Sequence, residues 1–395
     1  MEQQTHKPKR RVLKSLAVLI TAAVIFTAGF GLGRLDSSAS PNRTAFDYNS
    51  VEQLYGLLEK NFDGSLDRKE LLDGIKSGLV SAAGDPYTEY FNPEEAEDFN
   101  SGLRGSFTGI GAELGADAKG NIVIVAPLAG YPAEKAGLKP KDQIAAVNGE
   151  STSGLNVGEA VRKIRGPADT KVTLTIVRTG TQAFDVTITR AKITVPSVTY
   201  EVDGDIGYLK ISQFTEGTVE LVNNAAREFK AKRIKGIVLD LRSNPGGYLD
   251  TSVAVASLWL DNGKTVVSER RGSAVLSTKY SRGSHPFKGL PTVALINEGS
   301  ASAAEIMAGA LRDNGAATLV GAKTFGKGSV QQVENLPDGA ELKVTIARWY
   351  TPNGKNIDKQ GITPDVAVKI SDADQEAERD TQKDKAYEIL RSKVQ

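Results

Sequence analysis

Between residues 41 and 104 the apolar positions follow the period of an α-helix. In residues 51–61 and 68–83, apolar side chains recur three and four positions apart, as at Leu71 and Ile75. This spacing places them on one face of a helix and leaves polar side chains on the other. The sequence therefore predicts two amphipathic helices within a helical region at residues 41–104.

From residue 105 the pattern changes to short apolar runs separated by turn residues. Such runs are typical of β-strands, and four occur, at residues 122–125, 143–147, 172–178 and 184–190. Two helices are predicted between them, at residues 132–136 and 157–164. Together these elements predict a small β domain at residues 105–193.

From residue 206 onward, predicted strands alternate with predicted helices, which is the order of an α/β domain. The run GIVLDLR at residues 236–242 is almost wholly apolar, as expected for a strand covered on both faces. We place this α/β domain at residues 194–370. Residues 371–395 have a helical pattern but are mostly polar, and we expect a solvated helical tail.

At the N-terminus, five Lys and Arg residues precede an uncharged stretch at residues 15–33. The stretch is longer than a secretory h-region of about 7–15 residues and close to the roughly 20 residues of a spanning helix. We therefore expect an uncleaved signal anchor, with a tether up to residue 40. Ser37 and Ala39 leave a cleaved signal as the alternative. Because positive residues precede the stretch, we expect a single-pass plasma-membrane protein whose remaining domains lie in the periplasm or at the cell exterior.

Charge and composition exclude several classes of protein. Lys and Arg number 49 against 48 Asp and Glu, so no overall field attracts nucleic acid. The chain has no cysteine and two histidines, which excludes disulfides and sites that need several Cys or His ligands. We therefore expect no metal ion and no cofactor, and any chemistry must come from the remaining polar side chains.

A serine-rich segment, NEGSASAAEI, lies between a predicted strand and a predicted helix. At such a junction a hydroxyl is exposed beside the free N–H groups and positive dipole end of the helix, which stabilise a developing oxyanion. Ser302 is therefore a candidate nucleophile. On this segment alone, the better explanation is that Ser300 or Ser302 is a helix N-cap.

A serine nucleophile needs a base within hydrogen-bonding reach. His6 lies before the predicted anchor, and His285 lies in a loop with no paired motif. A lysine can serve if burial lowers its pKa towards neutrality, and Lys327, between Gly326 and Gly328, is the candidate. Its alternative is a solvated lysine in a turn.

The same lysine also belongs to a partial phosphate-binding loop, GxxxxGK, formed by Gly321, Gly326 and Lys327. However, Gly328 replaces the Ser or Thr that binds magnesium, and a β-like run follows where a helix is required. A nucleotide hydrolase is therefore the weakest alternative.

Five sequence blocks resemble the C-terminal processing peptidases, also called tail-specific proteases. They are LDLRSNPGG, GSASAAEI, LRDNG, KTFGKGSVQ and YTPNGKNIDKQGITPDV, and the resemblance runs from about residue 51 to residue 368. Within that range it implies a helical segment, a PDZ-like β domain and an α/β serine peptidase core. With the signal anchor expected from residues 15–33, the chain is predicted to be an α/β multidomain protein.

The resemblance also implies roles for individual residues. Ser302 is the expected nucleophile, Lys327 its base and Gln331 a residue that supports the lysine. The backbone of Ala303, with that of Gly246 or Gly247, is the expected oxyanion hole. Asp313 matches a residue that relatives need, which we expect to act in catalysis or in holding the architecture.

The β domain carries a second signature. In SFTGIGAELG, Gly109 and Gly111 flank Ile110 as in the loop of PDZ domains whose N–H groups bind the carboxylate of a peptide C-terminus. Arg165 resembles a residue that couples ligand binding to activation in relatives; its alternative is a surface charge.

From these observations we expect a serine endopeptidase that recognises accessible protein C-termini through the PDZ domain. The alternative from another class is a non-catalytic PDZ adaptor on a peptidase-like scaffold. The expected partners are protein substrates and, through residues 15–33, the membrane, but no nucleic acid. Further copies of this chain, in a homo-oligomer, or a regulatory protein are the other partners considered.

Overall fold

The computed structural model describes residues 47–117 and 119–394, which divide between Leu71 and Leu72 into two units. In the first unit, helix α2 (Tyr48–Asn61) begins at the N-cap Asp47, whose side chain accepts a hydrogen bond from the Asn49 amide. Helix α3 (Arg68–Ser81) follows. The two predicted amphipathic helices are therefore confirmed, and no residue of α2 is buried.

The β domain in the second unit is a sheet with strand order β3-β4-β5-β7-β8, with β6 paired to β5. Ile122, Ile144 and Leu174 lie in its core with the buried side chains of two helices. A separate ladder of β2 and β9 joins the two ends of the domain. The elements are β2 (Ser106–Gly109), β3 (Ala112–Ala116), β4 (Ile122–Pro127), α5 (Pro132–Lys135), β5 (Gln143–Val147), β6 (Glu150–Ser151), α6 (Val157–Ile164), β7 (Lys171–Val177), β8 (Phe184–Thr189) and β9 (Ala191–Thr194).

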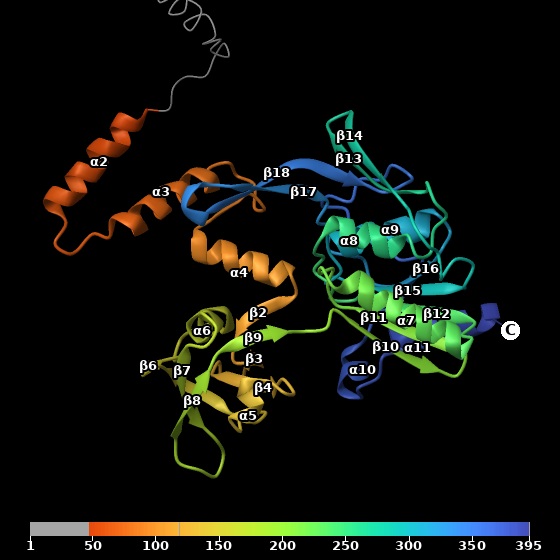
Figure 1. The fold of residues 1–395 in the computed structure, drawn as a ribbon, viewed down its shortest axis with the longest axis horizontal. Helices are drawn as coiled ribbons and strands as arrows, with labels where there is room; N and C mark the ends of the chain where they lie inside the picture. Colours follow the sequence, from red (N-terminus) through yellow and green to blue (C-terminus); the bar gives the residue numbers. More distant parts are fainter. Residues whose placement is uncertain (1–46, 118, 395) are drawn as a thin grey trace, which may run out of the picture. The chain divides into compact units, whose positions relative to one another are not determined.

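The α/β domain is built on a six-stranded sheet of order β10-β11-β12-β15-β16-β19, parallel except for β10. Helices α7 and α9 cover one face (Figure 1). Every residue of β12 is buried, which confirms the prediction of a strand covered on both faces. The elements are β10 (Val198–Asp203), β11 (Ile206–Ile211), α7 (Thr218–Lys232), β12 (Gly236–Asp240), α8 (Leu249–Ala256), β15 (Thr292–Ile296), α9 (Ala303–Asp313), β16 (Thr318–Gly321) and β19 (Val366–Ala367).

A second sheet combines strands from distant parts of the chain. Its order is β1-β18-β13-β14, with β17 also paired to β18. Strand β1 therefore brings the segment before residue 92 beside the last long strand of the protein. The elements are β1 (Glu89–Phe91), α4 (Pro93–Leu103), β13 (Thr265–Arg271), β14 (Ala274–Tyr280), β17 (Ser329–Asn335), the 3-10 helix η1 (Pro337–Gly339) and β18 (Glu341–Tyr350).

The C-terminal tail is not solvated as predicted. After α10 (Asp372–Glu376), helix α11 (Thr381–Val394) packs on the second face of the six-stranded sheet. Ala386 and Leu390 are fully buried there against apolar residues of β12, β15 and β16. The few apolar residues of this polar helix recur at helical spacing, and the open face of the sheet supplies the burial that the sequence of the tail does not show.

The predicted single-pass membrane localisation is contradicted. A spanning helix needs about 20 residues, whereas the longest helix in the described part of the chain, α7, has 15. Among those residues no helix is both long and apolar enough to cross a bilayer. The predicted anchor at residues 15–33 lies outside them. We therefore do not retain the assignment of the protein to the plasma membrane.

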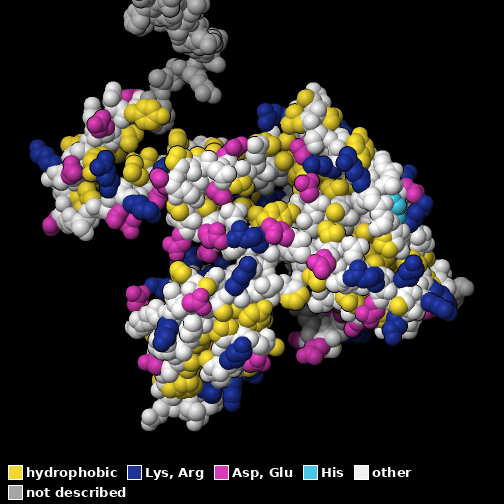
Figure 2. Space-filling view, viewed as in Figure 1, with side chains coloured by type: hydrophobic (Ala, Val, Ile, Leu, Met, Phe, Trp, Pro, Cys, Tyr) yellow, Lys and Arg dark blue, Asp and Glu magenta, His cyan; other side chains and the backbone are white. Residues whose placement is uncertain are grey.

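Figure 2 shows basic and acidic side chains intermixed over the visible face of the second unit. This distribution agrees with the net charge of +1. Recognition of a partner on this face must therefore depend on local groups.

Candidate active site

Ser302 is the N-cap of α9 and has an unusual backbone conformation, with φ 54° and ψ −117°. Few residues other than glycine adopt a positive φ, and holding one there costs about 1–3 kcal/mol. The preceding Ser300 is fully buried, and its hydroxyl donates to the Leu241 carbonyl. Of the two candidate serines, Ser300 is thus part of the core and Ser302 occupies the strained turn at the start of the helix.

The loop after β12 packs directly against this turn. A Cβ on Gly246 would lie 2.8 Å from the Ser302 Cβ and 3.1 Å from the Ala303 nitrogen, so only glycine fits. The Gly246 N–H donates to Asn244 Oδ1 at 2.9 Å. The Gly246 carbonyl accepts the Phe214 N–H, and the Tyr248 N–H donates to the Phe214 carbonyl. The N–H of Gly247, between them, takes no part in these two hydrogen bonds.

Arg242 fixes the start of the same loop. Its guanidinium lies 2.7 Å from Asp240 Oδ2 and 2.7 Å from Asp380 Oδ2. Asp240 is the last residue of β12 and Asp380 immediately precedes α11, so Arg242 ties the loop both to strand β12 and to the C-terminal tail. Ser243 follows with φ 55°, and its N–H donates to Asn297 Oδ1.

Glu305 joins the serine turn to the segment that carries Lys327. Its carboxylate is fully buried, and its Oε2 accepts the N–H groups of Ser302 at 2.9 Å and of Lys327 at 2.8 Å. Its Oε1 accepts the Gly326 N–H at 2.8 Å and the Thr324 hydroxyl at 2.5 Å. Burial raises the pKa of Glu305, and these four donors oppose that shift by stabilising the carboxylate.

Lys327 lies in the segment between β16 and β17. Burial and the nearby positive charge of Lys343 lower the pKa of its amine, whereas the charge of Glu89 acts in the opposite direction. Its Nζ lies 5.2 Å from the centre of the Tyr87 ring. Among the described residues, no hydrogen bond joins this amine to the Ser302 hydroxyl, although the backbones of both residues meet at Glu305.

Gln331 and Asp313 lie in different environments. The side-chain nitrogen of Gln331, on strand β17, which follows Lys327, donates to the hydroxyls of Ser329 at 2.7 Å and Thr345 at 3.2 Å. Asp313 is the last residue of α9, at the end of the helix opposite Ser302. It accepts hydrogen bonds from Arg312 and from the Asn353 amide, so the structure does not bring it to the other site residues.

In the β domain, Gly109, Ile110 and Gly111 connect β2 to β3. Gly111 has φ +75°, and a Cβ there would lie 2.5 Å from the Tyr131 Cβ, so the turn requires glycine. Strand β3 is at the edge of its sheet, next to α6. Arg165 is the C-cap of α6, with its guanidinium 5.0 Å from the centre of the Phe107 ring on β2.

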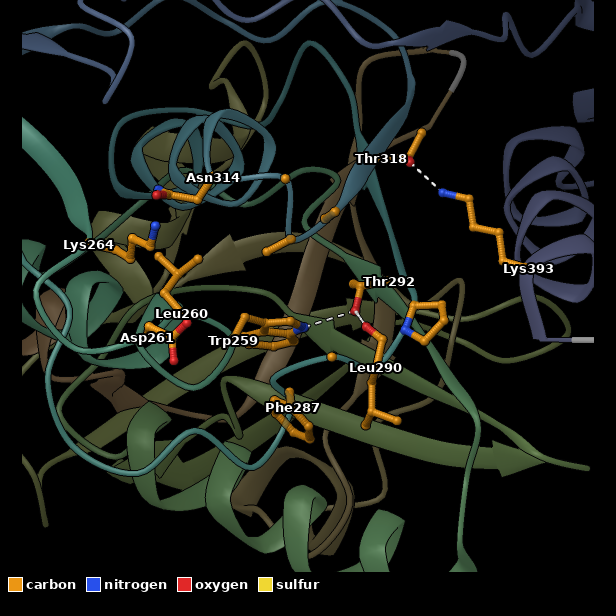
Figure 3. Close-up of a pocket in the computed structure, with 15 residues that line it drawn as sticks. Trp259, Leu260, Asp261, Lys264, Phe287, Leu290, Thr292, Asn314, Thr318 and Lys393 are labelled. Atoms are coloured by element: carbon orange, nitrogen blue, oxygen red, sulfur yellow. Dashed lines mark hydrogen bonds between the residues drawn. The ribbon is translucent and has the colours of Figure 1, made fainter.

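Other groups lie apart from Ser302. His285 Nδ1 is 2.7 Å from the Ser257 carbonyl oxygen. A cavity of about 520 Å³ is lined by Trp259, whose indole N–H donates to the Thr292 hydroxyl (Figure 3). Neither Ser302 nor Lys327 lines this cavity. Among the described residues, no group of three or more His, Asp or Glu is placed to hold a metal ion.

Two residues beside this site were not predicted from the sequence. Glu305 follows Ser302 at the spacing of a capping box, a signal that could have identified it. Tyr87 carries no comparable signal, because it lies 240 positions before Lys327 and reaches it only through the pairing of β1 with β18.

Comparisons with known proteins agree with the sequence blocks. The profile of peptidase family S41 matches residues 205–368, and the PDZ domain profile matches residues 123–178. The carboxy-terminal processing protease CtpA of Bacillus subtilis is 38% identical over 371 residues, which cover 92% of this chain and 78% of that protein. A probable CtpA-like serine protease of Staphylococcus aureus is 38% identical over 376 residues, covering 93% and 75%.

Solved structures show the same architecture. The photosystem II D1 C-terminal processing protease superposes with a TM-score of 0.52 at 29% identity, over 84% of this chain and 89% of that one. A putative S41 protease of Bacteroides fragilis gives 0.54 at 17% identity, over 85% and 93%, which shows the shared fold alone. The predicted family and enzyme class are thus confirmed: the chain belongs to peptidase family S41, is related to the C-terminal processing proteases, and is a serine-type peptidase that carries a PDZ domain.

Proposed function

We propose that the protein is an endopeptidase that cleaves through a Ser302–Lys327 dyad. The observation that carries this proposal is the buried Glu305 carboxylate, which binds the backbone of both residues at once. The lowered pKa of Lys327 supports it, because a partly buried amine is available as a base at a pH where an exposed lysine is protonated.

In the proposed reaction the neutral amine of Lys327 takes the proton of the Ser302 hydroxyl as its oxygen attacks the scissile carbonyl. The resulting ammonium gives the proton to the leaving amine, so the peptide bond breaks and an ester to Ser302 remains. Water then attacks the ester with Lys327 again as the base, and the serine is regenerated. The hydroxyl and the amine must approach within hydrogen-bonding distance for the first step, which such groups often do only with substrate bound.

We propose that the oxyanion forms between the N–H groups of Ala303 and Gly247. Ala303 is the first residue of α9, where N–H groups have no intrahelical acceptor. Gly246 is the less suitable partner since its N–H already donates to Asn244. The contact of Gly246 with the Ser302 Cβ would then set the distance between the loop and the nucleophile.

Gln331 would support Lys327 through its side-chain oxygen, because its side-chain nitrogen already donates to Ser329 and Thr345. For Asp313 we propose an architectural role. It accepts the Asn353 amide at 3.0 Å, which ties the end of α9 to the loop that carries YTPNGKN.

We further propose that the domain at residues 105–193 selects substrates by their C-termini and presents them to the core at residues 194–370. The B. subtilis relative is named as a carboxy-terminal processing protease. A peptide would add as a strand to the open edge of β3, with its carboxylate at the N–H groups of residues 109–111. Arg165, beside Phe107 at the base of this loop, could then sense the bound peptide.

The second candidate, a non-catalytic PDZ adaptor, predicts binding of C-termini without turnover. The strained backbone of Ser302 counts against it, since such strain persists mainly where function requires it. A nucleotide hydrolase is disfavoured because strand β17 follows Lys327, and because a side chain at position 328 would lie 2.0 Å from the Asp358 nitrogen.

The test uses pairs of protein substrates that differ only in their last residues, incubated with the wild-type protein, Ser302→Ala and Lys327→Ala. We expect cleavage by the wild type alone, with a loss of at least about 10³-fold in each variant. Cleavage that survives Ser302→Ala would exclude the mechanism. Cleavage indifferent to the C-terminal residues would exclude the role of the PDZ domain, and binding without any cleavage would favour the adaptor.

A further inference from the structure

Tyr87 comes from outside the α/β domain and lies against the candidate base. Its ring centre is 5.2 Å from Lys327 Nζ. A tyrosine at this place has two effects on an amine: its π face attracts the ammonium form, and its bulk keeps water away from the nitrogen. The effect of the ring on the amine depends on how firmly the ring is held and on which space it borders.

The segment around Tyr87 is anchored to β18 on its C-terminal side. Strand β1 pairs with β18 at Glu89–Phe91. The Thr88 hydroxyl accepts the Thr345 N–H at 3.1 Å and donates to Asp85 at 2.6 Å. The chain directly after Tyr87 is thus tied to β18, and Thr88 links it back to Asp85, so that the ring has a defined position rather than that of a free surface side chain.

An open cavity of about 730 Å³ borders Tyr87. Tyr87 lines it together with Asp85, Arg348 and Asp358, whereas Lys327 does not. Tyr87 therefore borders both this open space and, with its ring, the Lys327 amine. Burial raises the pKa of the Tyr87 hydroxyl, in keeping with a side chain that is itself partly shielded.

We propose that Tyr87 is a positioning residue for the base: its ring excludes water from one side of the Lys327 amine and restricts where the side chain can lie. The inference rests on the proposed dyad and adds to it a part of the site contributed by the segment before β1. It also assigns a function to a region that otherwise only completes the second sheet.

The direction of the effect follows from the groups that face Lys327. The π face of the ring attracts the ammonium form, but burial is the largest influence on this amine and favours its neutral form. Lys343 acts in the same sense and Glu89 in the opposite one. The charges of Lys343 and Glu89 remain when only Tyr87 is changed, as does the Glu305 carboxylate that accepts the Lys327 N–H. Loss of the ring should therefore raise the pKa of Lys327.

The experiment measures kcat/KM of the full chain against pH for the wild type, Tyr87→Phe and Tyr87→Ala, with one unfolded protein substrate. We expect Tyr87→Phe to keep the wild-type profile. In Tyr87→Ala the rising limb should move to higher pH, so that activity falls about tenfold at neutral pH for each unit of the displacement and recovers in alkali. Tyr280→Ala, a change of an exposed tyrosine on β14, is the matched control. Tyr87→Gln gives the same comparison should Tyr87→Ala fail to fold.

An unshifted profile in Tyr87→Ala, or an equal loss at every pH, would overturn the inference. So would a Tyr87→Phe variant that behaves like Tyr87→Ala, since the hydroxyl and not the ring would then be required. Lys327→Ala in the same assay separates the two proposals. If it keeps activity, the dyad is wrong; if it is inactive while Tyr87→Ala has the wild-type profile, only the role of Tyr87 fails.

Discussion

The backbone amides of Ser302 and Lys327 donate to the same oxygen atom, Oε2 of Glu305, at 2.9 and 2.8 Å. These two residues are 25 positions apart and belong to separate segments of the α/β domain. A single buried carboxylate therefore controls, through two backbone amides, how the turn that carries Ser302 and the segment that carries Lys327 lie relative to each other.

Glu305→Gln should impair catalysis more than it impairs folding. The amide presents an NH₂ group to two buried donors, and each unsatisfied donor costs about 1–3 kcal/mol. We expect kcat/KM to fall about 10- to 100-fold, measured on an unstructured protein substrate, with the folded state retained by circular dichroism. Glu298→Gln, at an exposed position of the same segment, is the control. Wild-type turnover in Glu305→Gln would show that the shared carboxylate is dispensable.

Activity should rise with pH through the folded pKa of Lys327, because only the neutral amine accepts a proton. Since burial lowers that pKa, the midpoint of the kcat/KM profile should lie below the ordinary lysine value of about 10.4. A midpoint at or above that value would contradict the assignment of Lys327 as a buried base.

The same shift predicts the pH dependence of stability. Between the lowered folded pKa and the unfolded one, the unfolded chain binds more protons at Lys327, so wild-type stability rises with pH in this window. Lys327→Met should therefore be the more stable protein below the folded pKa, and the difference should shrink as the pH rises to the unfolded value. Urea unfolding at several pH values measures this difference, and an advantage of Lys327→Met that is constant with pH would contradict the shift.

Gly246→Ala tests the contact between the loop and the nucleophile. Its Cβ would lie 2.8 Å from the Ser302 Cβ, at a residue with φ +109°. Gly263→Ala is the matched control, since it also has a positive φ, of +81°, but nothing lies within 4 Å. Gly263→Ala should lose about 1–2 kcal/mol of stability through backbone strain. Gly246→Ala should lose more, because its Cβ also clashes with Ser302, and only Gly246→Ala should lose turnover. Equal kcat/KM in the two would remove the loop from the mechanism.

Leu390→Ala tests the packing of the C-terminal helix on the sheet. Leu390 is fully buried, and such substitutions lower the free energy of unfolding by about 2–5 kcal/mol. Lys385→Ala, which removes only a partly exposed ion pair with Glu388, should change it by less than about 0.5 kcal/mol. Urea denaturation of both variants measures the difference, and similar midpoints would mean that α11 contributes little to the fold.

Much of the fold could be predicted because its signals are local. The apolar run around β12 and the helical period of α2 and α3 are properties of consecutive residues, and each element formed where the pattern predicted it. The packing of α11 could not be predicted in this way. Leu390 and Ala386 are two of few apolar residues in a polar helix. Their burial is explained only by the apolar face that β12, β15 and β16, more than 60 residues earlier in the chain, present to the helix.

The same difference between local signals and distant contacts applies to the residues of the site. Ser302 and Lys327 could be selected because each lies in a distinctive short block, whereas the shared carboxylate of Glu305 depends on two segments meeting in space. Tyr87 depends on the pairing of β1 with β18, to which the sequence around it gives no clue. Asp313 matches a family block, yet it is the last residue of α9 and therefore lies at the end of the helix opposite its N-cap, Ser302.

The backbone of Ser302 sets a conflict between durability and catalysis. At φ 54° and ψ −117°, glycine would relax the turn, so selection for folding alone would not place serine there. A selection for heat-resistant variants of this enzyme should therefore favour replacement of Ser302, the proposed nucleophile, and the stability gained there would come with loss of the hydroxyl. Improvements that keep the enzyme active must come from elsewhere in the chain.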